Sequence, residues 1–498
     1  MNVNPITRLD YPDPDVIRVE DTYYMVSTTM HFMPGCEILQ SFDLVHWEHA
    51  TYVYETLDHT DAQQLKSGQN IYGQGMWAAS LRYHEGRFYI CFVANDTRKT
   101  YLYTSEKIDG PWKKQLIEGF YHDGSLLFDE DGRNYIVYGN DEIWITELNE
   151  NLTAPKKDGL HRLLISDHRN PKLGYEGSHI YKIDGYYYIF LIHSMRDRWM
   201  RTEACFYSDS LEGEFTGADV LCDDRGYCGQ GVAQGGIVDT PDGKWYAVLF
   251  QDFGAVGRIP ILLPVTWKDH FPFFGQNGHV PEEIEVCSTR PDYTYQPLVG
   301  SDDFHNGLLP RWQFNHDPDP RYYHLDALQG TYTITTREVC TELTQAVNTL
   351  TQRMSYPSCA AEVTVDASAL KEGDVAGLCA LQSCYAAVGI TKHHGKYEVL
   401  MLDKKEDGIL DMTEGTVVES HQMDFRLEAD FCNMKDEARC YYRVNKGDWL
   451  PIGTVHKLYF KLDHFTGCRF GLFCYAAEET GGSACFRDFK YYDVDEIS

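Results

Sequence analysis

The sequence predicts an all-β protein in which a five-bladed β-propeller is followed by a β-sandwich. Two observations support the propeller: a hairpin pattern recurs five times in the first three hundred residues, and no long segment there has helical periodicity. A third observation supports the sandwich, because the last two hundred residues contain short alternating segments that do not follow this repeat.

The repeated unit is clearest in residues 174–190, GYEGSHIYKIDGYYYIF. The turn at Asp184 and Gly185 separates an apolar segment from an alternating aromatic one, a pattern typical of a β-hairpin. The second strand of this hairpin recurs at 20–27, 85–92, 131–138, 184–191 and 242–249. Because the chain between copies is long enough for a four-stranded antiparallel unit, each copy predicts one blade.

Each repeat carries a candidate site residue at one register position, twelve residues before a tyrosine of the hairpin and eleven in the first repeat. These residues are Asp13, Trp77, Asp123, Glu176 and Gln234. Equivalent positions of a propeller lie on one ring, and these precede the hairpin turn, so we expect them on the innermost strands. The sequence therefore predicts a polar cup in which three carboxylates, a tryptophan and a glutamine converge on the axis.

The residues around each candidate predict different local structures and roles. YPDPD places Asp13 between two prolines, which predicts a stiff, extended mount for the carboxylate, although a surface turn is the alternative. Trp77 would bound a sugar subsite with its flat face, although a lone Trp is more often part of a core. The acids 129–131 lack the alternating spacing of a calcium-binding loop and are interpreted as solvated turn residues. Arg258 follows a Gly-rich turn, where a guanidinium can clamp hydroxyl groups or neutralise carboxylates.

The pattern changes after the fifth repeat. Residues 271–300 are Pro-rich and irregular, which indicates a linker lying on the first domain. We therefore assign the propeller to residues 1–295 and the sandwich to 296–498. Three roles are open for the sandwich: covering the propeller mouth with a loop such as 464–467, binding glycan, or mediating assembly into a homo-oligomer.

Charge and composition exclude several classes of partner. The formal net charge of −31 argues against nucleic acid and anionic membranes and favours a neutral or cationic ligand. No window of about 18 apolar residues predicts a membrane span, and the first residues lack the features of a secretory signal. Fifteen scattered cysteines without a C-x-x-C pair favour reduced thiols in a cytoplasmic protein over disulfides.

The three inward acids favour general acid–base chemistry on a neutral substrate. Hydrolysis of a glycosidic bond needs two carboxyl groups, one to protonate the leaving oxygen and one to activate water or attack directly. A third carboxylate would orient the acid and raise its pKa by like-charge repulsion. The expected partner is a small oligosaccharide, and no cofactor is required.

Four stretches, NPITRLDYPDPDVIRVEDTYYMVSTT, HDGS, YEGS and GRIPILLPVTW, resemble glycoside hydrolase family 43, in particular its two-domain bacterial β-xylosidases and α-L-arabinofuranosidases. The resemblance covers nearly the whole chain and implies a five-bladed propeller with a concanavalin-like jelly roll. It also implies an inverting mechanism, in which Asp13 matches the general base and Glu176 the general acid. Asp123 matches the acid that orients Glu176 and modulates its pKa.

The resemblance also implies binding roles. Arg258 matches the pocket arginine that faces substrate hydroxyls, and Phe32 and Trp77 match the apolar walls of the glycone subsite. One position departs from the family pattern: many relatives place a His on the inner strand of the fifth blade, often near a central calcium or a water cluster. Here that strand carries Gln234, which puts a calcium at the axis in doubt.

The main hypothesis is an inverting exo-glycosidase that releases xylose from the non-reducing ends of β-1,4-xylo-oligosaccharides, with α-L-arabinofuranosidase as a side activity. The second is α-L-arabinofuranosidase as the main activity, because the two sugars present similar hydroxyl positions. A non-catalytic glycan-binding propeller is disfavoured because all three acids are present. A retaining propeller glycosidase is disfavoured because it needs a carboxylate separation of about 5 Å, against roughly 6.5–9.5 Å for inversion.

Overall fold

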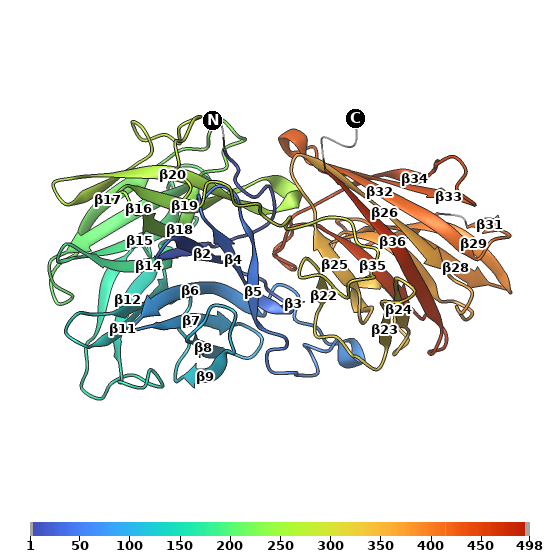
Figure 1. Cartoon of the computed structure of the whole chain (residues 1–498), viewed down its shortest axis with the longest axis horizontal. Helices are drawn as coiled ribbons and strands as arrows, with labels where there is room; N and C mark the ends of the chain where they lie inside the picture. Colours follow the sequence, from blue (N-terminus) through green and yellow to red (C-terminus); the bar gives the residue numbers. More distant parts are fainter. Residues whose placement is uncertain (1–2, 414, 494–498) are drawn as a thin grey trace.

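The computed structural model describes residues 3–413 and 415–493. Two β-rich bodies lie side by side, the propeller in blue to green and the sandwich in orange to red (Figure 1). The helical elements of the described residues are single 3-10 turns at Lys66–Gly68, Gly254–Val256, Leu343–Gln345 and Cys432–Met434. The predicted all-β architecture is confirmed.

The described chain contains five four-stranded antiparallel sheets, one for each predicted blade. Their strands are β1 (Asp15–Val19), β2 (Thr22–Val26), β4 (Gly35–Ser41) and β5 (Glu48–Tyr54); β6 (Met76–His84), β7 (Arg87–Ala94), β8 (Lys99–Ser105) and β9 (Lys113–Ile117); β10 (Ser125–Phe128), β11 (Asn134–Asn140), β12 (Glu142–Leu148) and β13 (His161–Ser166); β14 (Glu176–Ile183), β15 (Tyr186–Ser194), β16 (Arg201–Ser208) and β17 (Thr216–Leu221); and β18 (Ala233–Asp239), β19 (Trp245–Asp252), β20 (Arg258–Lys268) and β21 (Phe271–Phe274).

Contacts between β1 and β18 close the ring of blades. The N–H of Gly236 donates a 3.1 Å hydrogen bond to the carbonyl of Pro14, and Arg18 forms an ion pair of 2.5 Å with Asp239. A side chain at Gly236 would place its Cβ only 2.8 Å from Oδ1 of Asp15, so this approach of the two blades requires glycine.

Asp15 joins three blades below the predicted cup. Its fully buried carboxylate lies 2.7 Å from Nη1 of Arg82 and 3.1 Å from Nδ1 of His179, and it accepts a 2.7 Å hydrogen bond from the N–H of Leu81. The neighbouring Arg82 and His179 hold the pKa of Asp15 below its usual value despite burial. This charged cluster fixes the inner strands that carry the candidate site.

The second domain consists of two packed sheets. The first contains β3 (Phe32–Met33), β22 (Gln313–Asn315), β25 (Leu350–Arg353), β35 (Arg469–Tyr475), β27 (Val375–Leu381), β28 (Ala386–His393), β29 (Lys396–Lys404), β30 (Leu410–Met412) and β31 (Thr416–Val418). The second contains β23 (Tyr323–Asp326), β24 (Thr331–Thr335), β36 (Ser483–Asp493), β26 (Ser358–Asp366), β32 (Gln422–Asp430), β33 (Glu437–Arg443) and β34 (Leu450–Lys457).

The two domains share a sheet. Strand β3 lies in a loop of the first blade, yet it pairs with β22 of the sandwich through Met33 and Phe32. Arg353 of β25 reaches into the propeller, where its Nε donates a 2.9 Å hydrogen bond to the carbonyl of Asp10 and its Nη1 lies 2.8 Å from Oε2 of Glu37. The domains therefore pack through a buried, specific interface.

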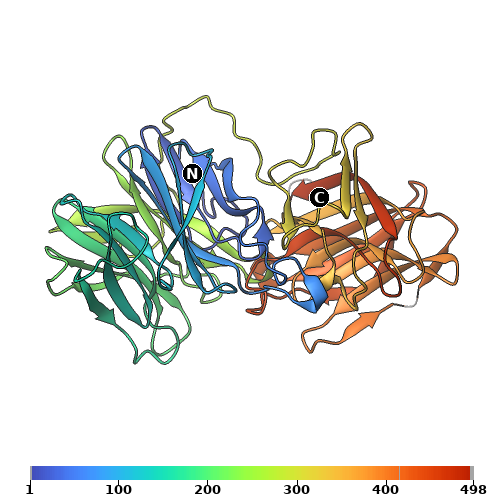
Figure 2. The same ribbon diagram turned by 90° about the horizontal axis from the view of Figure 1, so that it is seen from below.

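The segment between β21 and β22, which the structure describes in full, runs from the propeller to the sandwich without a helix or strand (Figure 2). It lies on the propeller as the sequence indicates, since the hydroxyl of Tyr246 donates to the carbonyl of Glu285 at 2.6 Å and the N–H of Gln296 donates to Oε2 of Glu48 at 2.8 Å. All fifteen cysteines are free thiols, as expected. None of the helices in residues 3–413 and 415–493 has the length and apolar character that a membrane span needs.

Candidate active site

A cavity of about 330 Å³ lies where the inner strands of the propeller meet a loop of the sandwich. It is lined by Asp13, Thr28, Met30, Gly73, Trp77, Ala78, His122, Asp123, Glu176, Gln234, Arg258, Leu462 and Phe465. The structure thus brings together all five ring positions and Arg258, from residues spread over most of the first domain.

Irregular backbone turns several ring residues toward the axis. Asp13, Asp123 and Gln234 have positive φ angles of 53°, 47° and 58°, and the pairing register shifts next to Trp77 and Glu176. Left-handed backbone costs a non-glycine residue about 1–2 kcal/mol, and such strain and bulges concentrate at functional sites. The prediction of an extended backbone at Asp13 is therefore wrong. The residue adopts a left-handed conformation, and its carboxylate lines the cavity.

The Asp13 carboxylate is held on both sides. Its Oδ1 accepts a 3.0 Å hydrogen bond from Nη1 of Arg258, and its Oδ2 accepts a 2.6 Å bond from the hydroxyl of Thr28. Asp13 is 7% exposed, and the Nε and Nη2 atoms of Arg258 are buried without a hydrogen-bond partner among the described residues. Since buried donors are nearly always paired, these two point to ligand oxygens in the cavity.

Glu176 and Asp123 form a second acidic group. Nδ2 of Asn140 donates a 2.5 Å hydrogen bond to Oε2 of Glu176, and the N–H of Gly177 donates a 3.1 Å bond to Oδ2 of Asp123. Nε2 of His122 lies 3.5 Å from Asp123 and 3.7 Å from Glu176. Burial raises the pKa of Asp123 to about 6, with the Glu176 and Asp13 charges adding to the rise and His122 opposing it.

Gln234 occupies the fifth ring position beside this group. Its backbone N–H donates a 2.7 Å hydrogen bond to Oε2 of Glu203, and its side-chain amide packs so closely on Gly177 that a Cβ there would lie 2.7 Å from it. Glu203 is fully buried, and burial raises its pKa to about 8. The buried Glu203 thus anchors the left-handed turn that presents Gln234 to the cavity.

Aromatic side chains from both domains wall the cavity. The Trp77 ring lies 5.9 Å from that of His122 and 5.5 Å from that of Phe465, and Phe465 also lies 4.4 Å from the Arg258 guanidinium. Phe465 and Leu462 belong to a sandwich loop that includes the segment expected to reach the mouth, and that expectation is confirmed for Phe465.

Phe32 is the predicted site residue that the structure places elsewhere. It is 2% exposed, belongs to the inter-domain strand β3, and lies 3.4 Å below the guanidinium of Arg469 from the sandwich. The loop around it turns toward the second domain because β3 pairs with β22. Phe32 is therefore not a cavity wall in this structure, and Met30 and Phe465 line the cavity instead.

Sequence reasoning missed His122, Asn140 and Thr28. His122 directly precedes Asp123 in the HDGS motif, so its position was visible although its side chain was given no role. Asn140 ends β11 and Thr28 follows β2, the second strands of their hairpins. The N–H of Gly139 bonds to the carbonyl of His122, and the N–H of Thr28 bonds to the carbonyl of Pro12. A place across the hairpin from a ring residue is therefore the signal that would find them.

Within the described residues, His122, Asp123 and Glu176 form the group of potential metal ligands whose atoms lie within 4.8 Å of one another. The group does not suit calcium, which prefers six to eight oxygen ligands. Both carboxylates already accept N–H donors, and neighbouring Asp123 raises the pKa of His122 to about 9, so a metal ion would have to displace a proton from the imidazole. The three residues instead form a cluster of two acids and an imidazolium, with Nε2 of His122 3.5 Å from Asp123 and 3.7 Å from Glu176.

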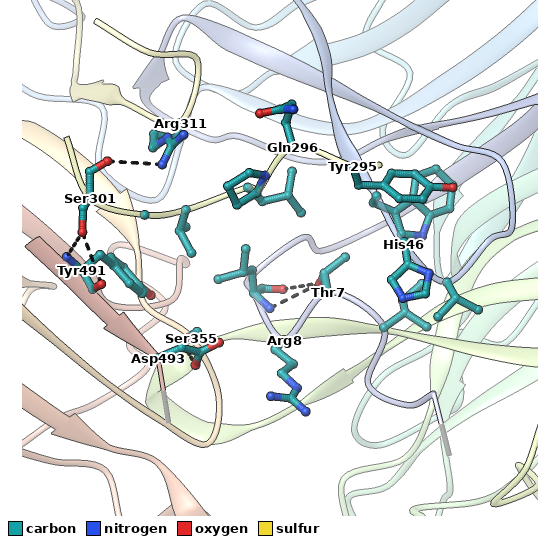
Figure 3. Close-up of a pocket in the computed structure, with 18 residues that line it drawn as sticks. Thr7, Arg8, His46, Tyr295, Gln296, Ser301, Arg311, Ser355, Tyr491 and Asp493 are labelled. Carbon is teal, nitrogen blue, oxygen red and sulfur yellow. Dashed lines mark hydrogen bonds between the residues drawn. The ribbon is translucent and has the colours of Figure 1, made fainter. Parts of the chain in front are cut away.

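A separate groove of about 590 Å³ lies between the N-terminal segment, the linker and the sandwich (Figure 3). Arg8, Arg311 and Tyr295 line it, and Asp493 is the acidic residue among the described residues on its walls. Because hydrolysis by acid–base catalysis needs two opposed carboxyl groups, this groove lacks the chemistry of the propeller cavity.

Comparisons with known proteins agree with this geometry. A model of the glycosyl hydrolases family 43 matches residues 3–272, and a model of the β-xylosidase C-terminal concanavalin A-like domain matches residues 301–492. A β-xylosidase of Formosa agariphila is 27% identical, over 99% of this chain and 89% of its own.

Two solved structures extend the likeness to the whole fold. A bifunctional GH43-CE protein of Bacteroides eggerthii is 42% identical with a TM-score of 0.92, and the match covers 98% of this chain but 63% of that longer protein. A family 43 hydrolase engineered for endo-xylanase and exo-arabinofuranosidase activity is 27% identical with a TM-score of 0.87, over 99% of both chains. With its propeller matched over nearly all its strands, the chain belongs to glycosyl hydrolases family 43.

Proposed function

We propose that this glycoside hydrolase is an inverting exo-enzyme that releases xylose from the non-reducing ends of β-1,4-xylo-oligosaccharides, with α-L-arabinofuranosidase as a side activity. The observation that carries the proposal is the arrangement of two separately held carboxyl groups, Asp13 and Glu176, around one small cavity. Asp13 is bound by Arg258 and Thr28, whereas Glu176 belongs to the cluster with His122 and Asp123.

The separate anchoring of these two groups supports inversion. Asp13 is not a member of the cluster in which the Glu176 carboxylate lies within 4.8 Å of both His122 and Asp123, and an inverting enzyme needs room for a water molecule between its two carboxyl groups. In the proposed reaction, Asp13 removes a proton from that water while the oxygen of the water bonds to the anomeric carbon. The glycosidic C–O bond breaks on the opposite face, and the leaving oxygen takes the proton of Glu176.

The form of the cavity supports attack at chain ends. Its volume of about 330 Å³ is at the lower end of the range of about 300–1,000 Å³ for ligand pockets, and Phe465 and Leu462 of the sandwich narrow it. The unpaired Nε and Nη2 atoms of Arg258 and the indole Nε1 of Trp77 are donors suited to the hydroxyl groups of a terminal sugar.

α-L-Arabinofuranosidase as the main activity is the second candidate. The relatives support both, since one is named a β-xylosidase and another belongs to work on an engineered enzyme that displays both endo-xylanase and exo-arabinofuranosidase activity. Rates on aryl β-D-xylosides and aryl α-L-arabinofuranosides decide between them. Proton NMR of fresh xylose tests the mechanism: α-xylose from a β-xyloside supports inversion, and β-xylose overturns it.

The proposed setting is the cytoplasm, and the proposed partner is a short imported oligosaccharide. Fifteen free thiols, several of them exposed, suit a reducing compartment. The charge of −31 disfavours nucleic acid and anionic membranes. Assembly into a homo-oligomer through the sandwich stays a proposal that measurement of mass in solution tests.

A further inference from the structure

The imidazole of His122 is a charged group that the acid–base scheme above leaves without a role. Its Nε2 atom lies 3.5 Å from Oδ2 of Asp123 and 3.7 Å from Oε2 of Glu176, and it is buried without a hydrogen-bond partner among the described residues. The ring lines the cavity, and its centroid lies 5.9 Å from that of the Trp77 ring. A buried donor that faces two carboxylates at slightly more than bonding distance requires an explanation.

We propose that His122 is a positioning residue of the general acid: its imidazolium stabilises the carboxylate that Glu176 becomes when it protonates the leaving oxygen. This inference rests on the proposed function and adds a residue to it. In the step concerned, the O–H bond of Glu176 breaks, its proton bonds to the glycosidic oxygen, and the C–O bond breaks. Glu176 then carries a full negative charge beside His122.

The charges around His122 support this role. Asp123 follows it on the same segment, Glu176 faces it from β14, and Asp13 lines the same cavity, where it forms an ion pair with Arg258. These acids, Asp123 most of all, raise the pKa of His122 to about 9, so the ring is cationic at neutral pH. A cation that is in place before the reaction stabilises the transition state, in which negative charge develops on Glu176. It stabilises the ground state less, because that charge is absent there.

His122 and Asp123 therefore act on Glu176 in opposite directions. The Asp123 carboxylate favours the protonated acid, and the His122 imidazolium favours the carboxylate that follows proton transfer. The nitrogen of His122 and the carboxylate oxygens of Asp123 and Glu176 all lie within 4.8 Å of one another, so a change of charge on one residue acts directly on the other two. Removing the cation is expected to make Glu176 bind its proton more tightly and release it less readily.

The test compares His122→Gln with wild type and with His193→Gln. His193 also lies between two acids, Asp167 and Asp219, but it is outside the cavity and serves as the matched control. For His122→Gln, the basic limb of the kcat/KM profile should move up by about one pH unit. Loss of kcat/KM should reach about tenfold for phenyl β-xyloside and stay small for the dinitrophenyl analogue, whose leaving group needs little protonation. An unmoved limb or equal losses on both substrates overturn the proposal.

A second measurement does not depend on turnover. In ¹⁵N-histidine spectra of wild type, assigned with His122→Gln or, if that does not fold, His122→Asn, the His122 ring should remain protonated to above pH 8. Titration near 6.5 overturns the proposal even in an active enzyme. Wild type without activity on aryl xylosides and arabinofuranosides overturns the proposed function instead, a result distinct from either outcome for His122.

Discussion

Oδ2 of Asp10 accepts a 2.8 Å hydrogen bond from the backbone N–H of Gly467, so a propeller carboxylate holds a loop of the sandwich domain in place. Its other oxygen, Oδ1, accepts a 2.8 Å bond from the N–H of Arg258, whose guanidinium binds Asp13. One buried side chain thus fixes both the loop that carries Phe465 and the strand that orients the proposed base. The second domain is therefore part of the site.

Phe465→Ala should lower kcat/KM by about tenfold to a hundredfold, mainly through a higher KM, because apolar contact with the sugar and the stacking on Arg258 at 4.4 Å are lost. Steady-state kinetics on an aryl xyloside measures the effect. Leu328→Ala, which removes an exposed apolar side chain of the same domain that does not line the cavity, is the control. An unchanged KM in a folded Phe465→Ala protein would contradict a role for the sandwich in binding.

Asp13→Asn should lower turnover by about a thousandfold on every substrate, because no group remains to accept the proton of water. The loss should be the same for good and poor leaving groups. Asp239→Asn is the matched control, since it also removes the acid of an Asp–Arg pair, with Arg18, outside the cavity. Recovery of activity with good leaving groups alone would assign Asp13 to a different step.

The ring of site residues could be predicted because a propeller converts a period along the chain into positions around an axis. Asp123, Glu176 and Gln234 occupy the same place relative to their hairpins, so one register located all three without knowledge of the loops. The left-handed backbone at Asp13 was not predictable in this way, because the turn depends on how Arg258 and Thr28 hold the carboxylate.

Residue positions that depend on contacts between distant segments could not be predicted from the sequence. Phe32 was placed in the cavity wall, but its strand pairs with residues near 314, and no local pattern encodes a partner so far along the chain. Phe465 was identified only as part of the example loop 464–467, and covering the mouth was one of three roles left open for the sandwich. Its position could not be predicted because it depends on the hydrogen bond between Gly467 and Asp10. His122 was visible in its motif, yet its role depends on where Glu176, from another blade, comes to lie.

Glu176→Ala should lower kcat/KM on xylobiose by about a thousandfold and on dinitrophenyl xyloside by less than about tenfold, because only the poor leaving group needs a proton. A series of aryl xylosides with graded leaving groups measures the difference. Asn140→Ala removes the 2.5 Å donor to Glu176 but keeps the carboxyl group, so it should show a weaker form of the same pattern. Losses independent of the leaving group would remove the assignment of Glu176 as acid.

Asp123→Asn should move the basic limb of the kcat/KM profile to lower pH, because the negative charge that favours protonated Glu176 is gone. The acidic limb should also change, since burial and the neighbouring acids raise the pKa of Asp123 to about 6 in the wild type and this titration disappears. The direction is opposite to that expected for His122→Gln. Shifts in the same direction for both variants would contradict the opposed roles of these two neighbours.

Three buried histidines at the domain interface predict a loss of stability in mild acid. The His31 and His316 rings lie 4.8 Å apart, and His464 stacks on Tyr72 at 3.8 Å. Burial lowers the pKa of His464 to about 3 and those of His31 and His316 well below the usual value. An unfolded histidine titrates near 6.5, so the unfolded chain binds more protons than the native one between these limits.

The contribution of these neutral histidines to the free energy of unfolding is therefore fully present above about pH 6.5. It falls as the pH decreases toward the folded pKa, by up to about 1.4 kcal/mol per pH unit for each such histidine. His464→Phe keeps an aromatic ring against Tyr72 but cannot be protonated, so its Tm should fall less than that of wild type between pH 7 and 5. The exposed His324, changed to Phe, should leave the wild-type slope intact. Equal slopes of Tm against pH for wild type and His464→Phe would mean that His464 is not held neutral at the interface. Acid lowers stability through this histidine only if the ring takes up a proton when the protein unfolds.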